Sequence, residues 1–197
     1  MRHLVVYLSR GQGVTADPAQ AGAWLHKAAD TGDAAPKALL GTILMAGEAS
    51  LGIGKDVARG FELLREAVAQ PGFDTLPGYG LALLNVAWCY LYGEGVEKDA
   101  VHGVCLLRQV ITQGDEVTAN AQAALATCYS TGDGVDVDLK QATKWSSRAA
   151  AGGYADAIQM LEVLRTCDFC GTPDAAKQWC ERCRKVRYCN ATCQRAH

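Results

Sequence analysis

Cysteines gather at the C-terminal end of this 197-residue chain, at spacings that suit metal binding. They form two Cys-x2-Cys pairs and then a wider Cys-x3-Cys pair, whose i, i+4 spacing would place both sulfurs on one face of a helix. A Cys-x2-Cys turn allows two thiolates to bind one zinc ion at about 2.3 Å. The six candidate ligands are Cys167, Cys170, Cys180, Cys183, Cys189 and Cys193.

Six thiolates exceed the four ligands that a structural zinc ion takes, so the pattern predicts two sites with the pairs interleaved. The Lys and Arg residues between the ligands offset the negative charge of a multi-thiolate site. A redox dithiol is the alternative, but it typically uses a single Cys-x2-Cys in a strand–helix context rather than three pairs in 27 residues. We therefore expect Zn²⁺ as the cofactor.

Charge divides the chain into two parts. From Cys167 to His197, six Lys or Arg and three Asp or Glu give a net charge of +3, which leaves −5 on the residues before them. No apolar run approaches the roughly 18 residues of a membrane span, and the run near Met1 is too short for a signal peptide. We expect an intracellular protein, cytoplasmic or nuclear, whose reducing surroundings favour metal binding over disulfides.

Gly-x-Gly pairs recur along the chain before the cysteines. Their second glycines are separated by 41, 41 and 39 residues, while the residues between them differ. A glycine just after a helix readily adopts the positive φ that the turn needs, so each pair is expected to end one helix. The four glycines are Gly13, Gly54, Gly95 and Gly134.

An aspartate follows each glycine pair and is expected to cap the next helix, because Asp is a favoured N-cap residue. Asp17, Asp99 and Asp138 come four residues after the second glycine, whereas Asp56 comes two residues after Gly54.

A second apolar helical stretch precedes three of the glycine pairs, and small residues within it would let neighbouring helices approach closely. These small residues are Gly41, Ala87 and Ala126. Each unit is therefore an antiparallel helix pair of about forty residues, a size typical of stacked repeats. The sequence predicts an all-α solenoid of helix hairpins over residues 1–165 and a small zinc-stabilised finger over 166–197.

The repeats carry the pattern ALxxxY-xxGxGVxxD…AxxWxxxAAxxG, which resembles the Sel-one-like (SLR) family, relatives of the tetratricopeptide repeat. The resemblance covers about residues 3–165, and Tyr154–Arg165 would form one further helix that caps the stack. It implies a scaffold that binds other proteins along a curved face, and it implies no catalytic residue.

Side chains within the predicted helices receive separate interpretations. Trp88 aligns with Thr42 and Thr127, off the Leu/Tyr stripe, so it is expected either to face a peptide-binding surface or to pack against the adjacent helix. Three cysteines inside helical patterns are expected to be buried small apolar residues rather than ligands. They are Cys89, Cys105 and Cys128.

The C-terminal stretch resembles the MYND-type zinc finger through CDFC, CERC and VRYCNATCQRAH over residues 167–197. The resemblance implies that one zinc is held by two pairs, and that Cys180 and Cys183 begin a second site. The pairs of the first site would be Cys167 with Cys170, and Cys189 with Cys193. Four thiolates leave no open position on that zinc, which is therefore expected to be structural.

The second site of the family is completed by a His and a Cys beyond a Trp, and the chain ends before those positions. We therefore expect a truncated or degenerate finger, in which the contribution of His197 is open. Gln194 matches a family position that contacts short proline-containing peptides, although the Trp that usually accompanies it is absent.

These observations predict a zinc-binding, non-enzymatic adaptor or scaffold whose partners are other proteins or their peptide segments, with no membrane partner. Two alternatives remain. The +3 charge of the finger allows a regulatory nucleic-acid-associated protein, although the basic and aromatic residues are few for that role. The chain could also be a fragment of a larger MYND-containing enzyme, since such fingers accompany separate catalytic domains.

Overall fold

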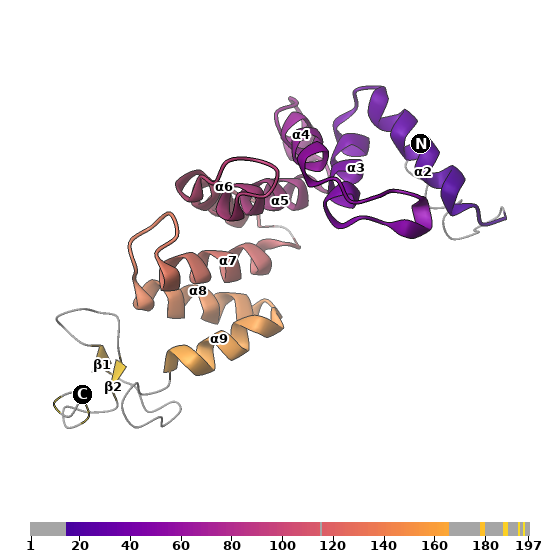
Figure 1. Ribbon diagram of the computed structural model, residues 1–197. Helices are drawn as coiled ribbons and strands as arrows, with labels where there is room; N and C mark the ends of the chain where they lie inside the picture. The colour runs from indigo at the N-terminus through magenta and orange to yellow at the C-terminus, as the bar shows by residue number, and fades with distance from the viewer. Residues whose placement is uncertain are drawn as a thin grey trace. The chain divides into compact units, whose positions relative to one another are not determined.

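The computed structural model describes residues 15–114, 116–165, 178–179, 187–188, Cys193 and Arg195 (Figure 1). Within them, the chain is built from helices joined by short turns. The α-helices are α2 (Pro18–Asp30), α3 (Ala34–Ala46), α4 (Val57–Val68), α5 (Tyr79–Tyr92), α6 (Ala100–Gln113), α7 (Thr118–Thr131), α8 (Leu139–Ala151) and α9 (Ala155–Arg165). The short elements are the 3-10 turns η1 (Ala49–Leu51) and η2 (Phe73–Thr75) and the strands β1 (Gln178–Trp179) and β2 (Arg187–Tyr188).

The helices belong to two compact units, which divide the chain between Asp99 and Ala100. The N-terminal unit contains α2 to α5, and the C-terminal unit contains α6 to α9 with the two strands. Within each unit, successive helices pack against one another, as α3 does on α4 and α7 on α8. The prediction of an all-α fold made of helix hairpins is confirmed.

Aspartate caps begin the helices that follow the glycine turns. The Oδ1 atom of Asp17 accepts a hydrogen bond of 2.9 Å from the backbone N–H of Gln20, and Asp56 accepts one of 2.9 Å from Arg59. Asp138 caps α8 in the same way. Capping satisfies backbone donors that have no partner inside the helix, so the sequence correctly located the starts of α2, α4 and α8.

A backbone hydrogen bond joins three of the recurring aspartates to the preceding helix. The N–H groups of Asp56, Asp99 and Asp138 donate to carbonyl oxygens of α3, α5 and α7 at 2.8, 2.9 and 2.9 Å. The three aspartates thus share a backbone contact with the helix before them, which is one reason for their recurrence in the sequence.

The second glycine pair does not end its helix, which corrects the prediction. α3 ends at Gly47, whose φ of 79° is left-handed, and η1 follows before Gly54, which is not among the residues with positive φ. The inserted turn is closed by a bridge between Glu48 and Ile53, and Ile53 is buried in the core. The pairs at Gly93–Gly95 and Gly132–Gly134 do have positive φ at both glycines, as expected.

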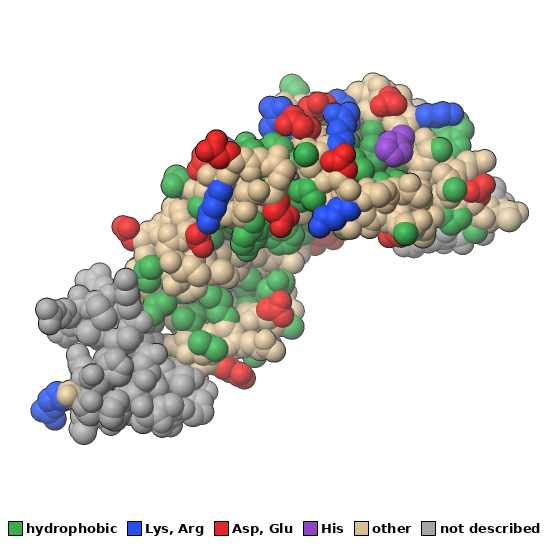
Figure 2. Space-filling view, in the orientation of Figure 1, with side chains coloured by type: hydrophobic (Ala, Val, Ile, Leu, Met, Phe, Trp, Pro, Cys, Tyr) green, Lys and Arg blue, Asp and Glu red, His purple; other side chains and the backbone are tan. Residues whose placement is uncertain are grey.

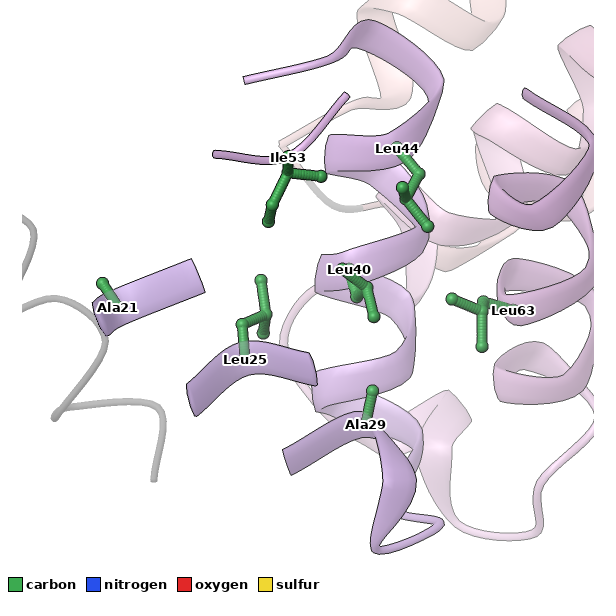
Figure 3. Packing of buried hydrophobic residues seen from close by; sticks show 7 residues of the cluster. All are labelled: Ala21, Leu25, Ala29, Leu40, Leu44, Ile53 and Leu63. Carbon is green, nitrogen blue, oxygen red and sulfur yellow. The ribbon is translucent and has the colours of Figure 1, made fainter. Parts of the chain in front are cut away.

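A buried apolar cluster of the N-terminal unit lies where α2, α3 and α4 meet. Leu25 of α2 and Leu63 of α4 lie on either side of Leu40 of α3, and Ile53 of the inserted turn closes the cluster (Figure 3). These apolar side chains are almost wholly removed from water, and burying each one contributes roughly 1.5–3 kcal/mol. The insertion therefore serves the packing of α2 as well as the turn.

Two glycines let α3 and α4 approach closely. A Cβ atom on Gly41 would lie 2.8 Å from Cγ of Leu64 and 2.9 Å from the carbonyl oxygen of Gly60, and a Cβ on Gly60 would lie 2.8 Å from the carbonyl oxygen of Gly41. The expectation that a small residue at Gly41 allows close packing is confirmed, and Ala87 and Ala126 at the aligned positions are fully buried.

The C-terminal unit contains a buried cluster of small side chains where α7, α8 and α9 meet. Ala123, Ala149 and Ala157 form a buried cluster, against which Tyr154 packs. Ser146 is fully buried in α8, where the aligned residues of the other repeats are Leu25, Leu64 and Leu107. Within the described residues, its hydroxyl has no hydrogen-bond partner.

Candidate functional site

Side chains of α3 and α5 form a partly exposed apolar surface on the N-terminal unit. Four residues of α5 have the spacing i, i+4, i+7 and i+11, which places them along one side of the helix. They are Leu81, Asn85, Trp88 and Tyr92. Leu81 is 38% exposed and Tyr92 is 64% exposed, while Trp88 is half-buried. We call this surface the α3–α5 face; it consists of Leu39, Thr42, Leu81, Asn85, Trp88 and Tyr92.

A hydrogen bond joins the two helices at the centre of this face. Nδ2 of Asn85 donates to Oγ1 of Thr42 at 3.2 Å, so these two side chains lie on the same side of α3 and α5. The Thr42 hydroxyl in turn donates to the carbonyl oxygen of Ala38 at 2.9 Å. Asn85 is only 7% exposed, unusual for an amide side chain.

The α3–α5 face carries no ionised side chain. The only Lys, Arg, Asp, Glu or His residue in the two helices is Lys37, whose Nζ lies 2.7 Å from Oε2 of Glu66 on α4. The hydrogen bond from Lys37 lowers the pKa of Glu66 below its usual value. On the surface that Figure 2 shows, acidic and basic side chains of the described residues lie among apolar ones.

The sequence prediction for Trp88 placed it off the buried stripe, and the structure agrees: Trp88 and Thr42 are half-buried, and Thr127 is exposed. Its role in peptide binding stays a prediction. Sequence reasoning missed Asn85, although a lone amide among apolar residues of an uncharged helix is a signal that could have revealed it.

The helical cysteines were interpreted correctly at two positions of three. Cys89 and Cys128 are buried, and burial, with a smaller contribution from the charge of Glu94, raises the pKa of the Cys89 thiol to about 11. Cys105 is exposed, which corrects the prediction. It lies on the side of α6 opposite Leu107, away from the buried stripe.

Two tryptophans at aligned positions pair with basic residues of their own helices. Nζ of Lys27 lies 5.0 Å from the ring centre of Trp24, and the guanidinium carbon of Arg148 lies 4.8 Å from that of Trp145. The i, i+3 spacing permits such cation–π contacts. They were not predicted, although the shared Trp-x-x-Lys/Arg pattern could have indicated them.

Strands β1 and β2 lie between the predicted zinc ligands. They are antiparallel, with Gln178 opposite Tyr188 and Trp179 opposite Arg187. Cys193 is half-buried and Arg195 is exposed. The other predicted site residues of the finger lie outside the described residues: Cys167, Cys170, Cys180, Cys183, Cys189, Gln194 and His197.

Comparison with family models identifies both parts of the chain. The Sel1 repeat model matches residues 6–33, 38–71, 80–115 and 119–154, which is more than half of the chain. The chain belongs to the Sel1 repeat family. The MYND finger model matches residues 167–197, so this Sel1 repeat protein also carries a MYND finger at its C-terminal end, as the cysteine pattern predicted.

Solved structures share the fold of this Sel1 repeat protein. A Sel1 repeat protein from Oxalobacter formigenes is similar with a TM-score of 0.64 and 23% identity, over 83% of this chain and 62% of the other. A protective antigen of uropathogenic Escherichia coli strains that displays an SLR fold is similar with a TM-score of 0.63 and 26% identity, over 82% of this chain and 32% of the other. The prediction of an all-α helical-repeat fold is thus confirmed.

Comparison with curated proteins gave no match. Sel1 repeats and MYND fingers are protein-interaction modules, and MYND fingers bind zinc. Among the residues that the structure describes, no helix is long and apolar enough to cross a membrane.

Proposed function

We propose that this Sel1 repeat protein is a non-enzymatic, intracellular adaptor in which the helical repeats and the zinc-bound finger each hold a protein partner. The observation that carries the proposal is the joining of two interaction modules in one chain. On this proposal, residues 1–165 form the repeat domain and residues 166–197 the finger. The α3–α5 face, with Trp88 on it, is the binding surface of the repeats.

The donor chemistry of the finger suits zinc. Cys-x2-Cys pairs supply thiolates, the ligands typical of structural zinc sites, and the bound ion would cross-link chain segments that are too short to bury a core of their own. Cys167, Cys170, Cys189 and Cys193 would hold one ion, while Cys180 and Cys183 would belong to a second site. A structural zinc contributes on the order of 10 kcal/mol to folding.

The pairing of β1 with β2 supports this division of the ligands. In the sequence, Cys180 follows Trp179 of β1 and Cys189 follows Tyr188 of β2. Antiparallel strands run in opposite directions, so the chain leaves β1 and leaves β2 at opposite ends of the pair. This arrangement favours Cys180 and Cys189 in different zinc sites.

Affinity capture with the full chain tests the adaptor proposal. Trp88→Ala should release the proteins held by the repeats, and Cys167→Ser should release those held by the finger, through loss of zinc. Cys105→Ser is the matched control, because Cys105 is an exposed cysteine on α6 and should leave both sets bound. If neither Trp88→Ala nor Cys167→Ser changed the captured proteins, the adaptor proposal would be wrong.

A further inference from the structure

Resting on the proposed zinc-bound finger, we infer that one side of α9 is the docking surface of the chain's own finger, residues 166–197, so that zinc binding stabilises the end of the repeats. We call this side, which carries Ile158 and Glu162, the α9 end face. Three observations support its role: the contacts of the aligned side in an earlier repeat, the exposure and charge of the face, and the short connection to the finger.

Alignment with the earlier repeats shows what this side of the helix normally contacts. The buried leucines that set the alignment are Leu40 of α3, Leu125 of α7 and Leu161 of α9. Ile158 then takes the position of Lys37 in α3. Glu162 takes the position of Gly41. Lys37 forms a 2.7 Å ion pair with a glutamate of α4, and a Cβ atom on Gly41 would lie 2.8 Å from Cγ of Leu64 on α4. In α3, this side therefore packs against the next helix.

The same side of α9 is open to water. Ala157 is 1% exposed and packs in a cluster with Ala149 of α8, whereas Ile158, the next residue, is 52% exposed. Glu162, one turn further along α9, is also exposed. The sequence after α9 matches the MYND finger over residues 167–197 rather than a further Sel1 repeat. Among the described residues, no later helix covers α9 as α4 covers α3.

The glutamate limits what can cover this face. Gly41 is small because the backbone of α4 lies within contact distance, and the larger side chain of Glu162 leaves no room for a repeat helix at that distance. A carboxylate that loses contact with water favours a partner of positive charge. The finger has a net charge of +3 from Cys167 to His197, whereas the residues before it carry −5. The finger therefore suits this face better than the repeats of a second copy do.

The connection between α9 and the finger is short. Only Thr166 separates Arg165, the last residue of α9, from Cys167, the first predicted zinc ligand. A short link gives an effective concentration on the order of millimolar, so even a weak contact with α9 is populated. Strands β1 and β2 also belong to the same compact unit as α9. Because the finger folds around its zinc, docking couples the ion to α9 in both directions: zinc protects α9, and the α9 end face strengthens zinc binding.

Hydrogen exchange of the full, reduced chain with and without zinc tests the inference. Removing the ion with a chelator should make the α9 amides exchange about tenfold faster, while the α3 and α4 amides of the N-terminal unit keep their rates. Ile158→Lys replaces an apolar contact by a charge that repels the basic finger. It should remove this difference and raise the dissociation constant for zinc about tenfold.

Two further variants separate the side of α9 from a general effect of substitution. Val163→Lys is the matched control, because it makes a similar change at a residue that is 74% exposed and that aligns with Thr42, away from the α9 end face. It should keep the zinc dependence of α9 and the wild-type zinc affinity. Glu162→Lys should weaken zinc binding more at low salt than at high salt, because exposed charge pairs are screened. Circular dichroism and the thermal midpoint verify folding, and if Ile158→Lys does not fold, Glu162→Lys carries the test.

Three results would overturn the inference: α9 exchange that does not respond to removal of a bound zinc, equal effects of Ile158→Lys and Val163→Lys, or concentration-dependent dimerisation that Ile158→Lys abolishes. The last result would assign the α9 end face to a second copy of the chain. If they occurred in a chain that elemental analysis shows to hold zinc, the adaptor proposal would stand and only the docking would be wrong. A folded chain that binds no zinc would overturn the zinc-bound finger of the proposed function as well.

Discussion

Replacing Gly60 by alanine tests whether the close approach of α3 and α4 organises the N-terminal unit. The new Cβ would lie 2.8 Å from the carbonyl oxygen of Gly41 and 2.9 Å from Cγ of Met45. The carbonyl belongs to a helix backbone and cannot turn aside, so the helices must separate. Overpacking of this kind costs about 3 kcal/mol, and the better helix propensity of alanine returns about 1 kcal/mol. The expected net loss is about 2 kcal/mol.

Urea unfolding combined with hydrogen exchange of the α3 and α4 amides measures this loss, because a global signal alone would mix the two compact units. Gly54→Ala is the matched control: nothing lies within 4 Å of its Cβ position, and its φ is not positive. That variant should stay within about 0.5 kcal/mol of the wild-type chain. A Gly60→Ala protein as stable as the control would refute the argument that backbone contact limits residue size here.

Three further predictions concern single side chains. Ser146→Ala should stabilise the C-terminal unit by about 1 kcal/mol, because it removes a buried hydroxyl without a partner. The control Ser147→Ala loses a 2.8 Å hydrogen bond to the carbonyl oxygen of Thr143 and should not stabilise the unit. Equal denaturation midpoints of the two variants would contradict the prediction. Because the pKa of the Cys89 thiol is raised in the folded chain, the unfolded chain loses this proton at a lower pH than the folded chain does. The free energy of unfolding should therefore fall as pH rises from 9.0 to about 11, and it should fall less in Cys89→Ala. Asp56→Ala should lower the free energy of unfolding by about 1 kcal/mol, because it removes the cap of α4. A decrease of less than a few tenths of a kcal/mol in urea unfolding would show that the cap contributes little.

Repetition made the helical part of the fold predictable from the sequence. Asp17 and Asp138 cap helices as expected, because a capping bond needs only the residue and the few that follow it. Gly41 was also recognisable, since three aligned copies showed that the position must be small. Because the same local features recur at aligned positions of each repeat, finding one in several repeats strengthens its prediction in each of them.

Features that depend on contacts between distant residues were not predictable. The end of α3 at Gly47 depends on the burial of Ile53 against α2 and α3, which no local pattern encodes. Cys105 fits an apolar helical pattern but points away from the core, because α6 has apolar residues on more than one side. The hydrogen bond of Asn85 was not predictable either, because its partner Thr42 is 43 residues away in the sequence.

Elemental analysis of the purified, reduced chain tests the account of the finger most directly. The account predicts zinc bound to every chain, lost in Cys167→Ser and retained in Cys105→Ser, whose exposed thiol lies on α6. A well-folded protein that holds no metal and joins its C-terminal cysteines in disulfides would contradict it.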